Sequence, residues 1–205
     1  MSETKSKAMP ASGRPTVSDA KRQRMRSEIA DCAKRLFQDE GYATVSIRRI
    51  AGEIGCSPMT LYKYYDAKID ILRTLWTDVF DQLFDQIETK PASCECHLHW
   101  LGSTYVQYWL DHTEFYRLVF LAEGVTQPDV SIFIDNPNLV QRFNVFAEAI
   151  ANTCSVEPKP HALQQKLDAF ICFLNGIAHN MITISGYPWS DPDEMVRMAV
   201  NAVTK

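Results

Sequence analysis

The sequence has 205 residues, enough for one large domain or two small ones with a buried core. Hydrophobic residues make up 46% of it while glycine and proline are few, which argues against a disordered or collagen-like chain. The formal net charge of -4 hides an asymmetry, because residues 1–68 hold 13 Lys and Arg against 8 Asp and Glu, whereas residues 69–205 hold 8 against 17. This division predicts that only the first part meets a polyanion.

The start of the sequence has no apolar stretch of the signal-peptide type, so we expect a cytoplasmic protein. Its six cysteines show no disulfide spacing, which indicates reduced thiols. The uncharged stretch over residues 169–190 includes Asn175, His179 and Asn180, a polar load that a membrane span rarely carries. We therefore expect a buried helix there and no membrane association.

Apolar residues at helical spacing, with start and stop signals, define the N-terminal elements. We expect a flexible basic arm over 1–17, a helix from Ser18 to Gly41, a short helix from a Ser46 cap to Gly55, a briefer helix from Ser57-Pro58, and a longer helix from an Asp66 cap to about Ile87. The same signals recur through the rest of the chain. They predict helices over His97–Leu110, Thr113–Ala122, Leu139–Thr153 and Pro160–Gly186, and a last one from Asp191-Pro192.

No alternating strand pattern interrupts these elements, so the fold class is all-α. We expect an N-terminal DNA-binding domain over residues 18–65 and a C-terminal helical domain for ligand binding and dimerisation over residues 66–205.

The three short N-terminal helices have the pattern of a helix-turn-helix, in which a supporting helix holds a recognition helix in the major groove. The small residue Ala51 lies where two helices approach closely, and Gly55 occupies a turn that needs a positive φ. Leu61 points inward. Pro58, Met59, Thr60, Tyr62 and Lys63 are left to face outward or sideways.

From Leu36 to Leu72 the sequence resembles the tetracycline-repressor (TetR) family. The matching positions are Leu36-Phe37, Gly41-Tyr42, Thr44-Val45-Ser46, Ile50-Ala51, Gly55, Ser57, Thr60-Leu61-Tyr62, Tyr64-Tyr65, Lys68 and Leu72. The departures are mild: Tyr65 stands where Phe is usual, Met59 where a small residue is common, and Ile54 where Ala is common. The resemblance covers about a third of the chain and implies a DNA-binding regulator.

The resemblance implies that the chain contacts double-stranded DNA through one set of side chains: Ser46, Arg48, Ser57, Met59, Thr60, Tyr62, Lys63 and Lys68. Met59 could touch a thymine methyl group, and Lys68 would hold a phosphate at the start of its helix. Arg22, Arg24 and Arg26 could add backbone or minor-groove contacts. Tyr64 and Tyr65 are interpreted as packing residues, and the sequence leaves the role of Arg49 open.

The helix from Pro160 is apolar on nearly every side, so it packs against more than one neighbour. The resemblance implies a homodimer in which this helix and the last one pair with their copies, through Phe170, Ile177, Met181, Met195 and Met198. The alternative is a core helix of a monomer, but a helix-turn-helix that reads a palindrome favours the dimer.

The middle helices are rich in aromatic residues, among which the family places a pocket for a small effector. The expected pocket residues are Trp100, Tyr105, Tyr108, Trp109, Phe115, Phe120, Phe143 and Phe146, with Asn175 and His179 as polar anchors. We expect a mostly apolar effector and no cofactor. Each of these aromatic side chains taken singly is more often ordinary core.

The segment with Cys94, Cys96, His97 and His99 suggests a metal site, but residues two apart on a helix point away from each other. We interpret it as a polar helix entry and expect no metal. The sequence contains no GxSxG, GxGxxG or HExxH motif, so we expect neither an enzyme nor catalytic residues. A ligand-responsive regulator, more often a repressor, that binds a pseudo-palindromic operator is the favoured function. A regulator that a protein partner controls is the alternative.

Overall fold

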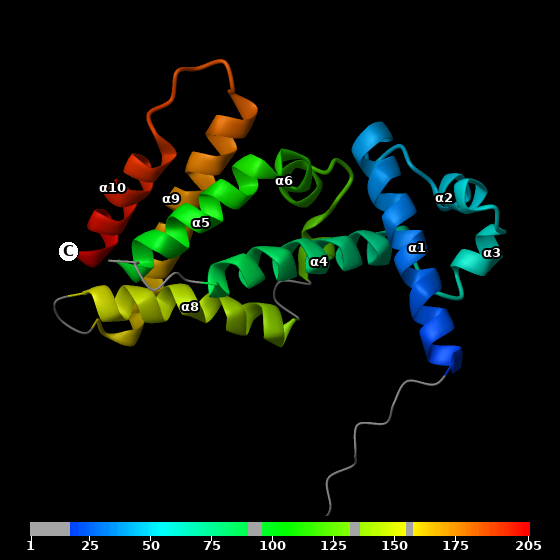
Figure 1. Ribbon diagram of the computed structural model, residues 1–205, viewed down its shortest axis with the longest axis horizontal. Coiled ribbons are helices and arrows are strands. Elements are labelled where there is room, and N and C mark those ends of the chain that lie inside the picture. Colours follow the sequence, from blue (N-terminus) through cyan, green and yellow to red (C-terminus); the bar gives the residue numbers. More distant parts are fainter. Residues whose placement is uncertain (1–16, 90–95, 132–135, 155–157) are drawn as a thin grey trace, which may run out of the picture.

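The computed structural model describes residues 17–89, 96–131, 136–154 and 158–205, and their elements are helical throughout. The elements are α1 Val17–Glu40, α2 Ile47–Ile54, α3 Pro58–Leu61, α4 Lys68–Glu88, α5 His97–Asp111, α6 Thr113–Phe120, a 3-10 helix Gln127–Ser131, α8 Pro137–Thr153, α9 Pro160–Thr183 and α10 Pro192–Thr204 (Figure 1). The all-α class is confirmed. The basic arm predicted over 1–17 lies outside the described residues except for its last position.

Local capping chemistry explains most helix ends. Ser46 and Ser57 cap α2 and α3 by accepting hydrogen bonds from backbone N–H groups three residues later, and Asp191 caps α10 in the same way. The cap predicted at Asp66 is wrong. The first helix position follows Ala67, whose N–H donates to the Asp70 carboxylate at 2.9 Å. The Asp70 carboxylate, inside the first turn, thus satisfies the N–H of the residue at the cap position.

Two other predicted ends are corrected. The long helix α9 ends at Thr183 rather than at Gly186, and α6 ends at Phe120 rather than at Ala122. The His112 carbonyl accepts the first backbone hydrogen bonds of α6, so α5 and α6 join with almost no loop.

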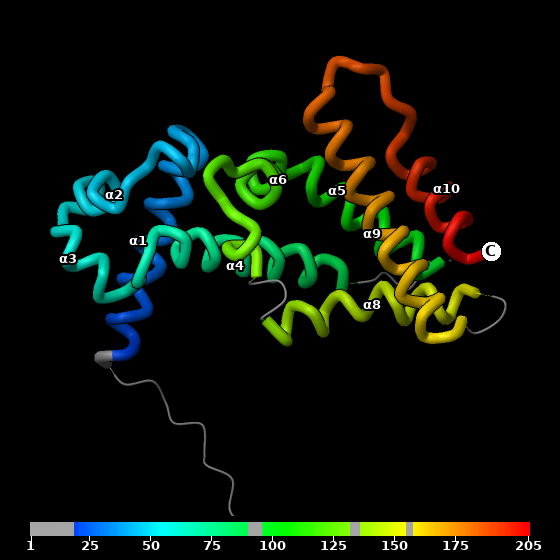
Figure 2. The backbone as a smooth tube through the Cα atoms, turned by 180° about the vertical axis from the view of Figure 1, so that it is seen from behind, coloured from blue at the N-terminus to red at the C-terminus, as the bar shows by residue number. Residues whose placement is uncertain are grey.

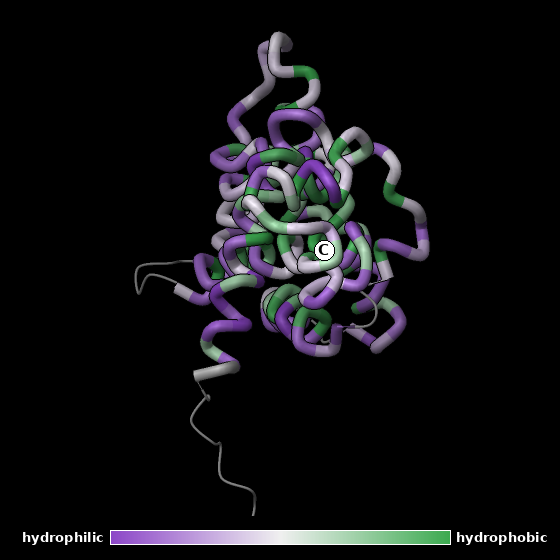
Figure 3. Tube along the Cα trace, turned by 90° about the vertical axis from the view of Figure 1, so that its right-hand side faces the viewer, coloured by the Kyte–Doolittle hydropathy of each residue, from purple (hydrophilic) through white to green (hydrophobic). Residues whose placement is uncertain are grey.

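The helices form an elongated molecule. Helices α1 to α3 lie at one end, and α4 runs from them toward the C-terminal helices α5, α8, α9 and α10 at the other (Figures 1 and 2). With 21 residues, α4 extends roughly 30 Å at about 1.5 Å per residue. Seen end-on, hydrophobic and hydrophilic residues alternate along the helices (Figure 3). Among the described helices, none is long and apolar enough to span a bilayer.

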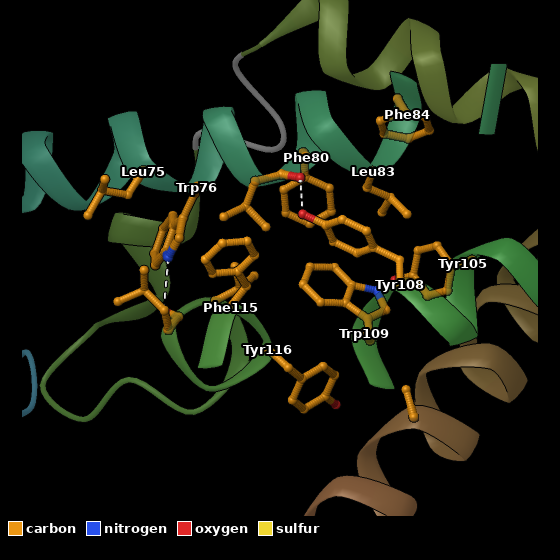
Figure 4. Close-up of a cluster of buried hydrophobic side chains, with 14 of the residues drawn as sticks. Leu75, Trp76, Phe80, Leu83, Phe84, Tyr105, Tyr108, Trp109, Phe115 and Tyr116 are labelled. Carbon is orange, nitrogen blue, oxygen red and sulfur yellow. Dashed lines mark hydrogen bonds between the residues drawn. The ribbon is translucent and has the colours of Figure 1, made fainter. Parts of the chain in front are cut away.

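An aromatic core joins α4, α5 and α6 (Figure 4). The Trp76 indole donates a hydrogen bond to the Leu118 carbonyl at 3.0 Å, and the Tyr108 hydroxyl donates one to the Val79 carbonyl at 2.9 Å. Trp109 is fully buried at the centre, with edge contacts to neighbouring rings. These two hydrogen bonds satisfy the polar groups of Trp76 and Tyr108, whereas the buried Trp109 indole N–H has no hydrogen-bond partner among the described residues.

Gly102 marks the closest approach of α5 to α9 and α10. A Cβ atom at this position would lie 2.8 Å from a Val196 methyl carbon, 3.0 Å from the Phe170 ring and 3.3 Å from Leu174. The three helices pack this closely because residue 102 has no side chain.

We expect Gly102→Val to lower the free energy of unfolding by about 1–3 kcal/mol or more, because overpacked cores are forced into strained arrangements. Chemical denaturation monitored by circular dichroism measures the change. The matched control is Gly52→Ala, since a Cβ atom there meets nothing within 4 Å. A Gly102→Val protein as stable as the wild type would contradict the packing described for α5.

Candidate nucleic-acid interface

Helices α2 and α3 form a helix-turn-helix whose inner side is buried, with α2 packed against both α1 and α3. Ile50, Ala51 and Leu61 are at most 1% exposed. Gly55 ends α2 with φ of +77°, in the left-handed region that favours glycine. The Ala51 carbonyl accepts from the Cys56 N–H at 2.9 Å across this turn. The roles that the sequence predicted for Ala51, Gly55 and Leu61 are confirmed.

The outer side of α3 presents its side chains to solvent. Met59 is 71% exposed and Tyr62 is 48% exposed, and Lys63 is exposed beside them. Met59 lies on the single turn of α3, and Tyr62 and Lys63 follow directly after its end at Leu61. Met59, Tyr62 and Lys63 are therefore accessible from solvent, and their contacts with DNA stay predictions.

The serines and Thr60 have local partners. The Ser57 hydroxyl accepts from the Thr60 N–H at 3.2 Å and lies 2.9 Å from the Thr60 hydroxyl. The Ser46 hydroxyl accepts from the Arg49 N–H at 3.1 Å. Each side chain thus fixes a helix start in this structure. Direct DNA contacts by Ser46, Ser57 and Thr60 stay predictions.

The two arginines of α2 differ in their surroundings. Arg49 is paired with Glu40 at 2.9 Å and with Glu53 at 2.7 Å, and Glu53 also accepts from Arg35 at 2.9 Å. The hydrogen bonds from Arg49 and Arg35 lower the pKa of the Glu53 carboxyl. The structure thus gives Arg49 a role in joining α1 to α2, which the sequence had left open. Arg48 is exposed, and its contact with DNA stays a prediction.

Helix α1 holds the end of α3 through two arginines. Arg26 donates to the Tyr64 carbonyl and lies 4.2 Å above the centre of the Tyr65 ring, while the Tyr65 hydroxyl donates back to the Arg26 carbonyl at 3.2 Å. Arg22 donates to the Lys63 carbonyl at 3.1 Å. Tyr65 is 3% exposed, so its interpretation as a packing residue is confirmed. Arg22 and Arg26 orient α3, a role that the sequence did not predict.

Lys68 at the start of α4 ties down the loop between α1 and α2. Its ammonium donates to the Tyr42 carbonyl at 2.6 Å and the Val45 carbonyl at 2.9 Å, and it lies 4.1 Å above the Tyr42 ring. Partial burial lowers the pKa of the Lys68 ammonium. Two of its three N–H donors thus serve the protein. The contact of Lys68 with a DNA phosphate, which would use the third N–H of the ammonium, stays a prediction.

We expect Lys68→Met to lower the free energy of unfolding by about 1–3 kcal/mol, because two buried carbonyls lose a charged donor. If Lys68 also holds a phosphate, the slope of log affinity against log salt should fall by about one unit. Thermal denaturation and DNA titration over a salt series measure the two effects separately. Unchanged thermal stability would contradict the structural role.

The surface predicted for dimerisation needs one correction. Phe170 is fully buried within its own chain against Gly102 and Phe146, so it has no area left to contribute to an interface. Phe173, three residues later, is 46% exposed. It lines an apolar groove between α9 and α10, together with Ile177, Met195, Met198, Ala199 and Ala202. Met181 is half-buried on α9.

The predicted effector residues fall into two groups. Tyr105, Tyr108, Trp109 and Phe146 are at most 1% exposed and touch one another edge to face, so they are core in this structure. The interpretation of single aromatic residues as ordinary core holds for these four. Burial raises the pKa of the Tyr105 hydroxyl far above its ordinary value.

The second group lies toward the surface at α9. The Tyr105 hydroxyl donates to the Asn175 side-chain oxygen at 2.8 Å, and the Tyr116 hydroxyl lies 3.2 Å from His179 Nδ1. Phe120 is 40% exposed beside them on α6, in ring contact with Trp109 and Tyr116. Phe115 is buried and Phe143 half-buried. The effector pocket as a whole stays a prediction.

A cavity of about 420 Å³ lies on the outer side of α5, where α10 begins. Trp100 and Tyr108 of the predicted set line it, with polar neighbours that include Ser103, Gln107 and Asp193. The Trp100 side chain therefore faces a different space from that of Trp109. The sequence analysis had placed both in one pocket, because the family resemblance implies an effector pocket among the aromatic residues of the middle helices.

The Cys/His segment is described only from Cys96 onward, and Cys94 lies outside the described residues. His99 Nε2 lies 3.2 Å from the Asp193 carboxylate, which also accepts from the Ser103 hydroxyl at 2.6 Å. These contacts attach the start of α5 to the start of α10. Within the described ranges, no group of three or more His, Cys, Asp or Glu side chains could hold a metal ion.

Comparisons with known protein sequences match the N-terminal part of the chain. Residues 29–75 match the model of the family "Bacterial regulatory proteins, tetR family". The HTH-type transcriptional regulator HbdR of Aromatoleum sp. (strain CIB) is 36% identical over 81 residues, which cover 37% of this chain and 35% of HbdR. The HTH-type transcriptional regulator SAUSA300_2515 of Staphylococcus aureus (strain USA300) is 40% identical over 75 residues, which cover 34% and 38%. The matches thus span little more than a third of these curated relatives.

Solved structures share the fold over nearly the whole length. Regulatory protein SCO4313 superposes with a TM-score of 0.72 at 21% identity, covering 92% of this chain and 98% of its own. NalD, the secondary repressor of the MexAB-OprM multidrug efflux pump in Pseudomonas aeruginosa, gives 0.63 at 16% identity, covering 90% and 95%. Residues 29–75 thus match the tetR family of bacterial regulatory proteins, and the chain as a whole shares the helical fold of these solved structures.

Proposed function

We propose that the protein is a transcriptional repressor that binds a pseudo-palindromic operator as a dimer and releases it when a small, mostly apolar effector binds. The observation that carries DNA binding is the exposed outer face of α3 and of the residues after it, with Met59, Tyr62 and Lys63, in a segment that Arg22 and Arg26 of α1 hold by hydrogen bonds. A short recognition helix with an apolar and basic outer face suits the major groove.

The proposed dimer forms through the apolar groove between α9 and α10. Two-fold pairing would cover Phe173 and Met198, which are otherwise 46% and 72% exposed. TetR-family regulators act as dimers, and two helix-turn-helix units on one two-fold axis match two half-sites.

The effector is proposed to enter from the α6 and α9 side, where Phe120, Asn175 and His179 reach the surface of the aromatic core. The few polar groups there, and the lack of Lys or Arg between Lys166 and Arg197, favour an uncharged or weakly polar ligand. Binding to DNA and binding to effector would then be linked, each changing the affinity of the other by the same factor.

The test is a selection of duplexes from a random pool by the full-length protein, followed by titration of variants on the selected sequence. We expect Met59→Ala to change which bases are preferred, because Met59 offers an apolar contact to a thymine methyl group. We expect Lys63→Ala to weaken all duplexes alike. Identical effects of both variants on a panel of altered operators would contradict the assigned roles, and recovery of no preferred duplex would contradict the function.

A further inference from the structure

One guanidinium joins α8 to the far end of α4. Arg142 on α8 meets the carboxylates of Asp81 at 3.0 Å, Asp85 at 2.7 Å and Glu88 at 3.1 Å, one through each of its nitrogens. Its guanidinium also lies 5.1 Å from the centre of the Phe84 ring. A single side chain thus holds three acidic residues on the last two turns of α4.

The single positive charge of Arg142 faces three negative carboxylates. We call this group of four side chains the Arg142 joint. The three carboxylates are four and three residues apart, which places them on one face of α4, where like charges repel. They are 56%, 74% and 61% exposed, whereas Arg142 is 22% exposed. An exposed single pair adds little to stability, but a partly buried guanidinium shared by three acids forms a network. Removing it would leave three unopposed negative charges on the helix.

Arg142 connects α4, which reaches the DNA-binding domain, to α8, which packs on the C-terminal helices. The other end of α4 carries Lys68, which binds the loop of the DNA-binding domain. Helix α8 in turn packs on α5 and α9, where Phe146 touches the rings of Tyr105 and Phe170 at 6.0 and 6.3 Å. Arg142 therefore links α8 to one end of α4, and the DNA-binding helices lie at the opposite end of α4 (Figures 1 and 2).

We propose that Arg142 is a positioning residue for DNA binding, which fixes the direction of α4 relative to α8 and thereby the separation of the two recognition helices in the dimer. This inference rests on the proposed function. A helix about 30 Å long converts a small tilt at one end into a larger displacement at the other. When the joint is lost, α4 samples more directions, and the apparent affinity falls with the fraction of molecules that fit the operator.

Apolar packing should keep the variant folded. Phe143, the next residue on α8, lies 4.8 Å from the Phe84 ring and 6.0 Å from the Phe80 ring. These contacts do not depend on Arg142. Loss of the guanidinium should therefore loosen the direction of α4 without separating the two helices.

The experiment compares Arg142→Met with the wild type on the operator selected above, on versions with one base pair added or removed between the half-sites, and on random-sequence DNA. We expect about tenfold weaker binding to the native operator and about tenfold less discrimination against the altered spacings. Binding to random DNA should stay unchanged. The control Arg197→Met removes an equal charge whose partner, Asp193, lies on its own helix at 3.0 Å, and it should bind within twofold of the wild type.

A second variant keeps Arg142 and replaces its partners, as Asp81→Asn, Asp85→Asn and Glu88→Gln together. It should show the same loss of spacing discrimination, and adding Arg142→Met to it should have little further effect. If either variant is less heat-stable yet keeps wild-type affinity and spacing preference, Arg142 is merely structural and the proposal is overturned. If the wild type itself selects no operator, the proposed function fails instead.

Discussion

The Met198→Asp protein should be a folded monomer that no longer binds its operator tightly. Met198 is 72% exposed in the single chain, so the substitution removes little packing within the subunit. The six residues that line the α9–α10 groove are all apolar. In a two-fold dimer a carboxylate there would be buried without a partner, at a cost of about 3–5 kcal/mol, and this would weaken dimerisation by at least a hundredfold.

Light scattering over a concentration series gives the oligomeric state, and circular dichroism shows whether the helices persist. The matched control is Val140→Asp, on α8 and outside the groove, where a 46% exposed side chain should accept the same charge harmlessly. DNA affinity should fall with the dimer, because a monomer contacts one half-site only. A Met198→Asp protein that stays dimeric at the same concentrations would place the interface on another surface.

The parts of the fold that sequence predicted well are those that local chemistry determines. Ser46, Ser57 and Asp191 cap their helices because a short acceptor side chain beside a helix start has a donor within reach. Gly55 takes a positive φ because the turn after α2 allows little else. The exposed face of α3 follows from the same reasoning, since Leu61 fixes which side is buried.

Apart from a few helix ends, such as the cap predicted at Asp66, the predictions that failed depend on contacts between residues far apart in the sequence. Periodicity showed that α9 is apolar on nearly every side, but it could not tell which side faces its own chain. Gly102 decides this, because the missing side chain on α5 admits Phe170 and leaves Phe173 outside. Lys68 was likewise recognised as a cation at a helix start, whereas the carbonyls that it binds lie 26 and 23 residues earlier.

The aromatic set shows the same limit. Composition could not separate rings that fill the core from rings that border an opening, because both are apolar and lie on the same helices. The hydroxyl contacts of Tyr105 to Asn175 and of Tyr116 to His179 separate them, by marking where the core reaches polar groups at the surface.

The main effect of Trp109→Ala should therefore be a loss of thermal stability. The Trp109 side chain is fully buried among Phe80, Tyr105, Tyr108 and Tyr116, with ring centres 5.1–6.0 Å away. Truncating such a residue leaves a cavity and costs about 3–5 kcal/mol. For a chain of this length that corresponds to a fall in Tm of about 6–20 °C. Differential scanning calorimetry on the wild type and the variant measures it.

The matched control is Trp189→Ala, in the turn between α9 and α10, where the indole is half-buried and donates to the Ile184 carbonyl at 3.0 Å. Its effect on Tm should be a fraction of that of Trp109→Ala, because little core is lost.

Effector response is better tested with His179→Ala, since His179 is exposed and its loss leaves the ring cluster intact. A Trp109→Ala protein with wild-type Tm would mean that the core tolerates an opening of indole size, as an effector pocket at that position requires.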